Sequence, residues 1–350
     1  METEFRAIVQ SEYGAPEQVL KIAKRQFKSE DIGADDVLVK VVARPIHHGD
    51  IQILSALPQG GPVAPIPKGT LRVPGFEGVG IIVGLGTNAE AAKRFSEGQR
   101  VAFFPANGSW GEYVVVRYTS LLAIPNEVPN QVAAQMLINT ITASLLIKAG
   151  HNSLKTPITF PVYILQNAAV SGVGRLLTQV ALDRGVRPIR LVRSRQSAEK
   201  LRSAFPGPPV FSTGDGNWKE RVREALEGHK LEVVFDAVGG TAIDDLAEVV
   251  DDGGTIISYG SLGSNTGANI YSLAPKNVAL KSVHIMSWFR LTPDEKQKDF
   301  ELALGLATNR PELFEVAHEY EFDDFQKAIQ HVSSPGKTGM ILLKSQNDKG

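Results

Sequence analysis

Short runs that mix apolar, mostly β-branched residues with polar ones dominate the first third of the chain. Five such runs are separated by glycine, proline and asparagine: FRAIVQ at 5–10, VLVKVVARPI at 37–46, GVGIIVGLG at 78–86, RVAFF at 100–104 and GEYVVV at 111–116. Short strands at this spacing are typical of a barrel or a sandwich. The segment 54–74, dense in proline and glycine, is predicted to be a long surface loop.

The periodicity changes near residue 130. The run at 131–150 has a helical pattern, and from 161 onward short apolar strands alternate with amphipathic helices. Uniformly apolar strands separated by helices predict a parallel sheet that is covered on both faces and binds ligands at the carboxyl ends of its strands. The predicted fold class is therefore α/β, with a doubly wound parallel sheet of the Rossmann type. A helix at 323–332 and a strand at 336–344 close the chain.

Composition and charge narrow the class of protein. A chain of 350 residues with 43% hydrophobic and 21% charged residues suits two domains and can bury a substantial core. The 37 Lys and Arg balance 38 Asp and Glu, a net charge of −1, so no nucleic-acid or anionic-membrane partner is expected. No run of about 18 apolar residues is present to cross a bilayer. The absence of cysteine excludes disulfides, thiolate nucleophiles and iron–sulfur clusters.

The first ten residues, METEFRAIVQ, carry Glu2 and Glu4 and lead directly into a strand pattern. A secretory signal needs a basic start and an apolar stretch, and a mitochondrial presequence avoids acids. We therefore expect a cytoplasmic protein.

The strongest single motif is ILQNAAVSGVG at 164–174, where a strand gives way to a helix. Glycines at such a turn let the backbone approach a pyrophosphate, and the helix N-terminus offers free N–H groups and a positive dipole. The full G-x-G-x-x-G spacing is absent, and Ser171, Gly172, Val173 and Gly174 stand in its place. We expect these four residues to bind a dinucleotide; a tight turn without a ligand is the alternative.

The end of the next strand discriminates between the two nicotinamide dinucleotides. NAD-binding proteins place Asp or Glu there to hold the ribose 2′-hydroxyl. Here the strand runs into Arg193, Ser194 and Arg195, with no acid. Guanidinium groups bind a 2′-phosphate bidentately and an acid repels it, so the sequence predicts NADPH rather than NADH. A solvated basic strand end is the alternative.

Two further strand ends are expected to face the cofactor. They are the DAVGG run at 236–240 and the run of Tyr259, Gly260, Ser261 and Leu262. Each closes a buried strand mostly with small residues, which leave room for a ribose and a nicotinamide. Packing alone also explains small residues at these positions.

Four motifs together carry a resemblance to a known family: GFEGVG at 75–80, SGVG at 171–174, DAVGG at 236–240 and GKTG at 336–339. Through them nearly the whole chain resembles the medium-chain dehydrogenase/reductase superfamily. The resemblance implies a split chaperonin-10-like barrel domain, residues 1–130 plus 311–350, and an inserted Rossmann domain, residues 131–310. It also implies a homodimer formed by edge strands of the Rossmann sheet, with 278–283 as the candidate edge.

The zinc-dependent alcohol dehydrogenases of that superfamily carry Gly-His-Glu in the first motif, with the histidine as a metal ligand beside a cysteine. This chain has Phe76 at the histidine position and no cysteine. An aromatic ring has no lone pair for zinc, and His47 and His48, as neighbours on a strand, are expected to point to opposite faces. We therefore expect no metal site.

Within the superfamily the chain is more similar to the zinc-free quinone reductases and 2-enoyl thioester reductases, through the segments 138–143, 166–174 and 192–195. This resemblance implies further NADPH contacts at Asn139, at Lys337 and in a segment near 284–289. The enoyl thioester reductases also use a tyrosine as proton donor to the substrate. That tyrosine lies shortly after a strand, which the resemblance places here over 50–54. The corresponding positions here are Leu57 and Pro58, neither of which can donate a proton.

The chemistry that suits a metal-free site is hydride transfer from NADPH to a conjugated C=C, such as that of a 2-enoyl thioester or an enone. Hydride addition to such a bond gives an enolate, which forms more easily than the alkoxide of an unactivated ketone and so needs no Lewis acid. The enolate then takes its proton from solvent or from His47 or His48, which titrate near neutral pH. A structural histidine bonded to the backbone is the alternative for both.

Three alternative functions remain: an NADPH:quinone reductase, an enoyl reductase component of a larger synthase, and a non-catalytic NADPH-binding protein. The acceptor pocket is expected to involve the loop 54–74, with Phe103, Phe104 and Trp110 either lining it or packing in the barrel core.

Overall fold

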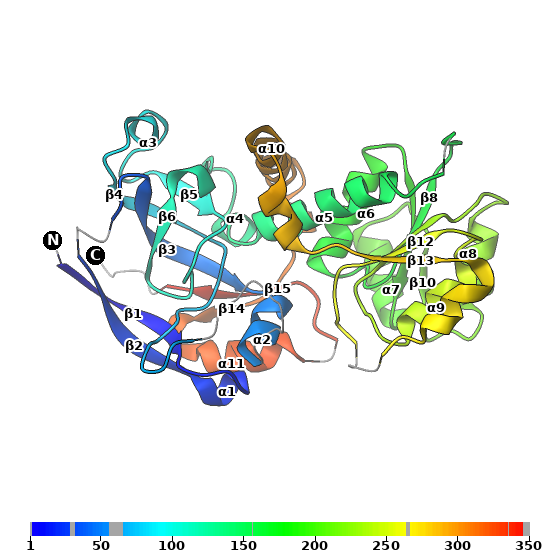
Figure 1. Cartoon of the computed structure of the whole chain (residues 1–350), viewed down its shortest axis with the longest axis horizontal. Helices are drawn as coiled ribbons and strands as arrows, with labels where there is room; N and C mark the ends of the chain where they lie inside the picture. The colour runs from blue at the N-terminus through cyan, green and yellow to red at the C-terminus, as the bar shows by residue number, and fades with distance from the viewer. Residues whose placement is uncertain are drawn as a thin grey trace. The chain divides into compact units, whose positions relative to one another are not determined.

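The middle of the chain folds as a unit of its own, inserted between two segments that fold together (Figure 1). The computed structural model describes residues 2–28, 32–55, 66–155, 157–263, 267–334 and 336–345. Residues 1–138 and 300–350 make up one unit, the barrel unit, and residues 139–299 make up the other, the Rossmann unit. The predicted boundaries at 130/131 and 310/311 both fall inside the barrel unit of this division, and as domain limits they stay predictions.

The barrel unit is built on a mostly antiparallel sheet. Its strands lie in the order β14-β15-β3-β4-β5-β7, with β6 also paired to β3. Their bounds are β3 (Asp36–Ile46), β4 (Gly78–Leu85), β5 (Arg100–Phe103), β6 (Tyr113–Arg117), β7 (Leu121–Ala123), β14 (Val316–Glu321) and β15 (Met340–Lys344). The helices of this unit are α1 (Pro16–Val19), α2 (His48–Ser55), α3 (Ala89–Arg94), α4 (Asn130–Ala133) and α11 (Phe325–Val332), with 3-10 turns at Tyr118–Ser120, Pro311–Leu313 and Phe322–Asp324.

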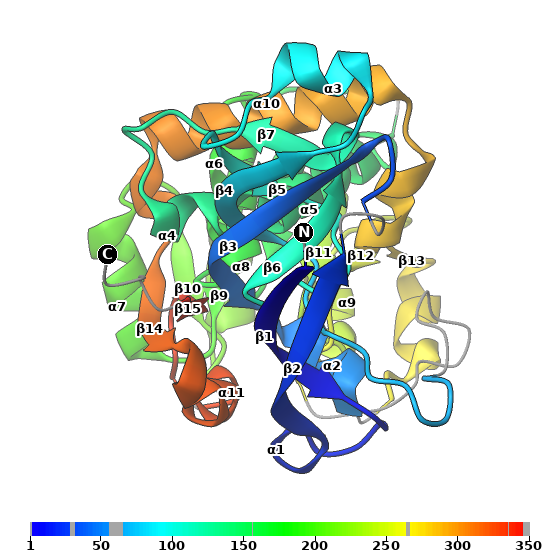
Figure 2. The same cartoon turned by 90° about the vertical axis from the view of Figure 1, so that its left-hand side faces the viewer.

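The first two strands, β1 (Glu2–Gln10) and β2 (Leu20–Lys28), form a separate antiparallel ribbon (Figure 2). The ribbon is attached to the segment just before β6, where Ile8 N–H donates to the Trp110 carbonyl (3.0 Å) and Glu112 N–H donates to the Arg6 carbonyl (2.9 Å). Trp110 is fully buried and packs in one apolar cluster with Ile8 and Phe322, while Phe103 is fully buried in another. Phe104 is also buried. These aromatic side chains therefore belong to the barrel core.

The strand expected over 50–54 is wrong, because these residues lie in helix α2. Asp50, in the first turn of that helix, accepts the backbone N–H of His47 (2.8 Å), and its own N–H donates to the His47 carbonyl (3.0 Å). This is half of a capping box, a local helix-start signal that outweighs the β-branched residues that follow. His47 and His48 are accordingly not neighbours on a strand, since β3 ends at Ile46. In the predicted loop, residues 66–74 form no helix or strand beyond a single bridge, and 56–65 lie outside the described residues.

The Rossmann unit is a sheet of parallel strands in the order β10-β9-β8-β11-β12-β13. The strands are β8 (Tyr163–Gln166), β9 (Arg187–Val192), β10 (Val210–Ser212), β11 (Val233–Asp236), β12 (Thr255–Ser258) and β13 (Ala279–Ser282). The helices are α5 (Met136–His151, which begins in the barrel unit), α6 (Gly172–Leu182), α7 (Arg195–Ala204), α8 (Trp218–Ala225), α9 (Ala242–Val249) and α10 (Pro293–Asn309, which ends there), with 3-10 turns at Ile270–Lys276 and Ile285–Arg290.

Numbered along the chain, this strand order is 3-2-1-4-5-6, the doubly wound order of dinucleotide-binding folds. The order reverses between β8 and β11, and right-handed connections then place helices on opposite faces of the sheet. Leu176, Leu177, Val180 and Ala181, which share one face of α6, are all buried. The predicted α/β fold class is confirmed, and the carboxyl ends of β8 and β11 are where such a sheet binds its ligand.

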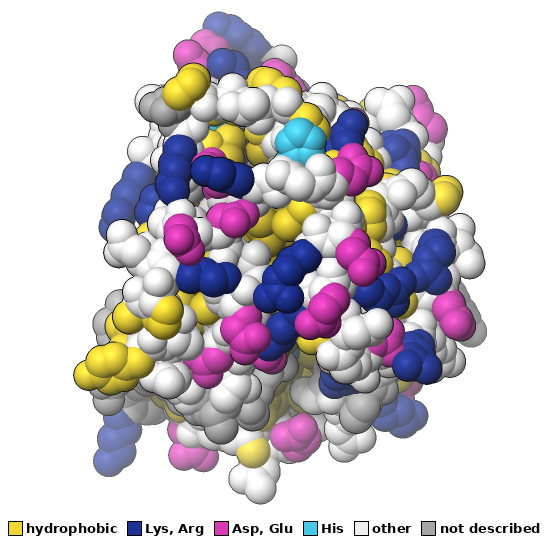
Figure 3. All heavy atoms as spheres, turned by 90° about the vertical axis from the view of Figure 1, so that its right-hand side faces the viewer, with side chains coloured by type: hydrophobic (Ala, Val, Ile, Leu, Met, Phe, Trp, Pro, Cys, Tyr) yellow, Lys and Arg dark blue, Asp and Glu magenta, His cyan; other side chains and the backbone are white. Residues whose placement is uncertain are grey.

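The surface of the chain carries charges of both signs side by side. On the face shown in Figure 3, Lys and Arg side chains are interspersed with Asp and Glu, in keeping with the net charge of −1. None of the helices in the described ranges combines the length and apolar character needed to cross a membrane.

Two glycines of β4 provide a test of how closely the barrel strands approach. A Cβ at Gly80 would lie 2.3 Å from the carbonyl oxygen of Lys40 on β3, whereas a Cβ at Gly84 meets nothing closer than the Leu38 Cβ at 3.6 Å. We expect Gly80→Ala to lower the free energy of unfolding by about 1–3 kcal/mol, because backbone must move. Gly84→Ala should be neutral or stabilising by up to about 1 kcal/mol, because alanine is less flexible in the unfolded chain. Urea unfolding of both variants measures this, and equal effects would contradict the close approach.

Candidate active site

The turn after β8 is shaped by close packing around its two glycines. Ser171 caps α6, and its hydroxyl oxygen accepts the N–H of Gly174 (3.1 Å). A Cβ at Gly174 would lie 2.7 Å from the Ala168 carbonyl oxygen, and one at Gly172 would lie 2.9 Å from the Asn139 side-chain nitrogen. The turn therefore admits only glycine without rearrangement, and Asn139 of α5 lies beside the start of α6.

A buried polar network joins the carboxyl ends of β8, β11 and β12. The Asp236 carboxylate accepts hydrogen bonds from the Asn167 side-chain amide, from the Ser258 hydroxyl and from the N–H groups of Val238 and Gly239. The Asn167 side-chain oxygen in turn accepts the N–H of Ala237 (2.7 Å). Both residues lie within sequence motifs, and the run 236–240 was expected to face the cofactor, but this hydrogen-bond network was not predicted. The available signal was a polar side chain placed directly at the end of an otherwise apolar strand.

Tyr259 follows β12 and lies beside this network. Burial, and then the negative charge of Asp236, raise the pKa of its hydroxyl well above the ordinary value, and a contact with Ser171 opposes the rise. The hydroxyl oxygen is buried and makes no well-formed hydrogen bond among the described residues. After it, the N–H of Leu262 donates to the Ala237 carbonyl (3.0 Å), so the run 259–262 is fastened to the end of β11. The side chains of Ser261 and Leu262 are exposed.

The basic residues after β9 occupy different environments. Arg193 has an exposed side chain, and Ser194 caps α7 by accepting the Ser197 N–H (3.2 Å). Arg195 is the first residue of α7, and its Nε–H donates to Asp215, which follows β10. This bond and the charge of Asp215 raise the pKa of Arg195. Sequence reasoning missed Asp215, because it lies 20 positions from Arg195.

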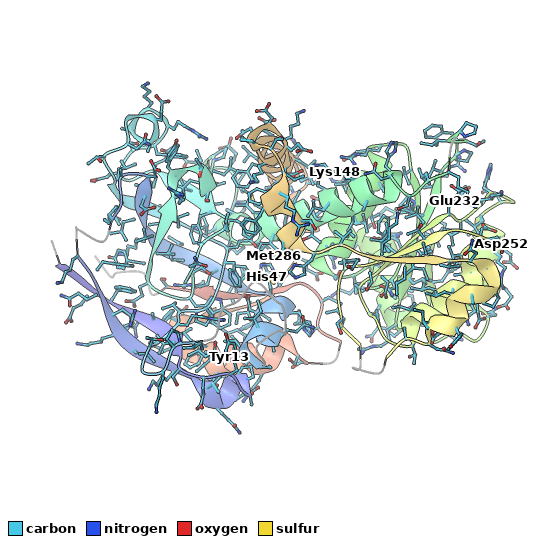
Figure 4. All side chains as sticks on the ribbon, in the orientation of Figure 1. Tyr13, His47, Lys148, Glu232, Asp252 and Met286 are labelled. Carbon is cyan, nitrogen blue, oxygen red and sulfur yellow. The ribbon has the colours of Figure 1, made fainter. Side chains whose placement is uncertain are left out.

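In the barrel unit, His47 (Figure 4) pairs with a buried carboxylate. Its Nε2 lies 2.9 Å from Oε2 of Glu77, whose other oxygen accepts the N–H groups of Leu137 (2.8 Å) and Ile138 (3.3 Å) at the start of α5. A carboxylate accepts only, so Nε2 carries the proton in this bond. His48 is the first residue of α2 and is half-buried.

The acid–base properties of this cluster follow from burial and charge. Burial by itself lowers the pKa of His47, but the hydrogen bond and charge of Glu77, helped by Asp50, outweigh it and leave the pKa raised. Burial raises the pKa of Asp50 to about 6 even though His47 opposes the rise. Lys337 adds a positive charge near His47, and burial lowers its own pKa. Its Nζ donates to the Gly339 carbonyl (2.8 Å).

Two further expectations from the sequence concern the segment 284–289 and the residues Leu57 and Pro58. The segment 284–289 forms most of the 3-10 turn Ile285–Arg290, where the His284 side chain accepts the Met286 N–H (3.3 Å). Leu57 and Pro58 lie outside the described residues. Within the described ranges, no group of three or more His, Asp or Glu side chains is placed to hold a metal ion.

Two family models match the chain. Residues 33–126 match the alcohol dehydrogenase GroES-like domain, and residues 172–308 match the zinc-binding dehydrogenase model. The first of these agrees with the chaperonin-10-like barrel that the sequence implied.

Relatives and solved structures extend the likeness over nearly the whole chain. A mitochondrial enoyl-[acyl-carrier-protein] reductase of Arabidopsis thaliana is 28% identical over 342 residues, covering 95% of this chain and 86% of the relative. A putative NADPH:quinone reductase from Bacillus thuringiensis has a TM-score of 0.83 at 25% identity, covering 98% of this chain and 100% of the other. A mycobacterial protein complexed with NADPH has a TM-score of 0.80 at 26% identity, with 97% and 99% covered. Taken with the fold and the two domain matches, these likenesses show that the chain belongs to the medium-chain dehydrogenase/reductase superfamily.

Proposed function

We propose that the chain is an NADPH-dependent oxidoreductase that reduces an activated C=C bond, such as that of a 2-enoyl thioester or an enone. The observation that carries this proposal is the ligand-binding edge of the Rossmann sheet, where a glycine turn and two arginines follow adjacent strands β8 and β9. The Arabidopsis relative is by name an enoyl reductase, and the mycobacterial structure holds NADPH. The first supports the reaction proposed here, and the second supports its cofactor.

The residues present fit a phosphorylated dinucleotide. Gly172 and Gly174 leave no Cβ over the start of α6, so a pyrophosphate has backbone N–H groups to approach. The buried Tyr259 hydroxyl beside Ser171 is a polar atom that a ligand at the turn would satisfy. Arg193 and Arg195 supply the positive charge that a 2′-phosphate requires. Asn139 and Lys337 are further proposed contacts.

NADPH supplies the hydride, and the chain's own residues have to hold the acceptor, exclude water and manage a proton. His47 is a proposed proton source, because its raised pKa keeps more of it protonated near neutral pH. Its Nε2–H is committed to Glu77, so a proton for the acceptor has to leave from Nδ1. His48 is the alternative donor. We propose that no metal takes part, since the chain lacks the cysteine and histidine ligands of the zinc-dependent enzymes.

A quinone is the second candidate acceptor. Its reduction places protons on oxygen, which exchanges them readily with solvent, so it needs no donor at carbon. The presence of Leu57 and Pro58 where enoyl thioester reductases carry a tyrosine favours this reading, as does the name of the Bacillus thuringiensis structure.

We also infer a homodimer and a cytoplasmic location. Among the described strands β13 is the last of the Rossmann sheet, all four of its residues are exposed, and large apolar side chains are exposed on and around it: Ile270, Tyr271, Leu280, Met286 and Phe289. An apolar strand edge of this kind is suited to pairing with a second copy. Sedimentation velocity tests the dimer, since a single species of 37.8 kDa would contradict it. The cytoplasmic location is a proposal only, and the plant relative is by name mitochondrial.

Stopped-flow oxidation of NADPH against crotonyl-coenzyme A, cyclohexenone and benzoquinone tests the proposed activity. We expect the highest kcat/KM with the enoyl thioester, because its β-carbon is activated and the relative of that name covers most of the chain. Turnover with benzoquinone alone would favour the second candidate. Binding of NADPH without oxidation by any acceptor would contradict both.

Replacing Arg193 and Arg195 together by alanine tests the choice of cofactor. Each charge-assisted bond to a phosphate is worth about tenfold or more in affinity, so we expect KM for NADPH to rise by about a hundredfold. KM for NADH should change little, because it has no 2′-phosphate. Steady-state kinetics with both cofactors measure the split, and an equal rise for the two would refute the assignment.

His47→Ala and His48→Ala distinguish the two proton donors. If His47 donates, its loss lowers kcat by about a hundredfold. The wild-type kcat then falls as pH rises through the raised pKa of His47, because the neutral ring has lost the donated proton, and His47→Ala lacks this limb. His48→Ala should keep the wild-type profile. Thermal unfolding of both variants controls for the buried Glu77 left without its partner, and unchanged turnover in both would remove the histidines from the reaction.

A further inference from the structure

We propose that Asp215 is a positioning residue for cofactor selection: it fixes the guanidinium of Arg195 so that the chain discriminates a 2′-phosphate from a 2′-hydroxyl. This inference rests on the proposed NADPH-dependent function. The two side chains differ in burial: that of Arg195 is 81% exposed, and that of Asp215 is only 11% exposed. A long exposed arginine loses much rotamer freedom on binding a phosphate unless the protein already holds it.

Asp215 is held rigidly by the loop after β10. Its N–H donates to the Ser212 carbonyl (3.1 Å), and its own carbonyl accepts the N–H of Trp218 at the start of α8 (3.2 Å). Ser212 also reaches the neighbouring strand end, where its hydroxyl donates to the Arg193 carbonyl (3.3 Å). The end of β10 therefore holds the backbone of Arg193, and the loop after it holds the side chain of Arg195.

The bond to Asp215 uses the inner edge of the Arg195 guanidinium. Because Nε–H is the donor, the two terminal nitrogens stay available, and they form the fork that binds a phosphate bidentately. The second carboxylate oxygen lies 3.7 Å from a terminal nitrogen of Arg221, whose guanidinium stacks over the Phe211 ring at 4.5 Å. Asp215 is thus balanced by two arginines, and the strand end remains basic although an acid lies next to it.

An alternative partner shows what Asp215 prevents. A hollow of about 300 Å³ opens beside the pair and is lined by Arg195, Glu199, Arg202, Asp215 and Arg221, among others. Glu199 lies four positions after Arg195 on α7, the spacing at which a helix pairs opposite charges. Without Asp215, the Arg195 side chain is expected to turn toward Glu199 and away from the cofactor. In NAD-binding proteins, the acid at the end of the second strand favours a 2′-hydroxyl. Asp215, the acid after β10, instead favours a 2′-phosphate, because it acts through Arg195.

The experiment measures the dissociation constants of NADPH, NADH, 2′,5′-ADP and 5′-AMP by calorimetry, which needs no turnover. The variants are Asp215→Ala, Asp215→Asn, Arg195→Ala and the double variant Arg195→Ala/Asp215→Ala. Asp245→Ala is the matched control, because Asp245 pairs with Lys219 (2.7 Å) in the same unit. We expect Asp215→Ala to weaken NADPH and 2′,5′-ADP by about tenfold while NADH and 5′-AMP bind as before. Asp215→Asn keeps an oxygen that accepts the Nε–H of Arg195, so it should retain part of the preference for NADPH over NADH.

The double variant separates positioning from a structural effect. If Asp215 acts through Arg195, the double variant binds NADPH as Arg195→Ala does, and this result supports the proposal. Equal weakening of NADPH and NADH in Asp215→Ala, or a loss in the double variant beyond that of Arg195→Ala, overturns it. If Asp215→Ala keeps the normal preference for NADPH over NADH while Arg195→Ala loses it, the positioning role of Asp215 is also overturned. The proposed function is unaffected by that result. If Arg195→Ala keeps the full preference for NADPH, the 2′-phosphate assignment itself fails.

Discussion

The buried carboxylate of Asp236 is the interaction on which the ligand-binding edge depends. Parallel strands end at the same edge of a sheet, but their connecting turns leave in different directions, and nothing in the strand hydrogen bonds fixes those turns relative to one another. Asp236 accepts hydrogen bonds from groups that lie at or just after the ends of β8, β11 and β12. Because the carboxylate is fully buried, it would be costly to leave it without these donors. The glycine turn, the 236–240 run and the Tyr259 run are thereby held in one geometry.

Much of the architecture could be predicted from the sequence, because it follows from local patterns. The change in periodicity near residue 130 separates a β-rich segment from alternating strands and helices, and the 3.6-residue stripe of α6 is buried as its spacing indicates. The turn at 171–174 is recognisable because Gly174 packs against the backbone of Ala168 and Ala169, which precede it by only a few positions. The one wrong element, over 50–54, failed because a capping interaction at Asp50 outweighed the strand-like composition of the residues after it.

The contacts that define the side chains of the site could not be predicted, since they join segments distant in sequence. Glu77 meets His47 and the start of α5, 30 and about 60 positions away, and Asp215 meets Arg195 across two strand ends. No periodicity records such pairings. The sequence placed basic residues after β9 correctly but gave no reason to expect an acid beside them, and it offered His47 as a titratable group without its partner.

The pairing of Glu77 has a consequence for how this chain can diverge. One of its oxygens accepts a hydrogen bond from the His47 ring, and the other accepts backbone N–H groups at the start of α5. Glutamine would still anchor the helix but would leave a protonated ring without a counter-charge, whereas aspartate would keep the charge and fall short by a methylene. Replacement of this single residue therefore alters the proton affinity of His47, the position of the helix, or both. Of these three side chains, only glutamate keeps both properties.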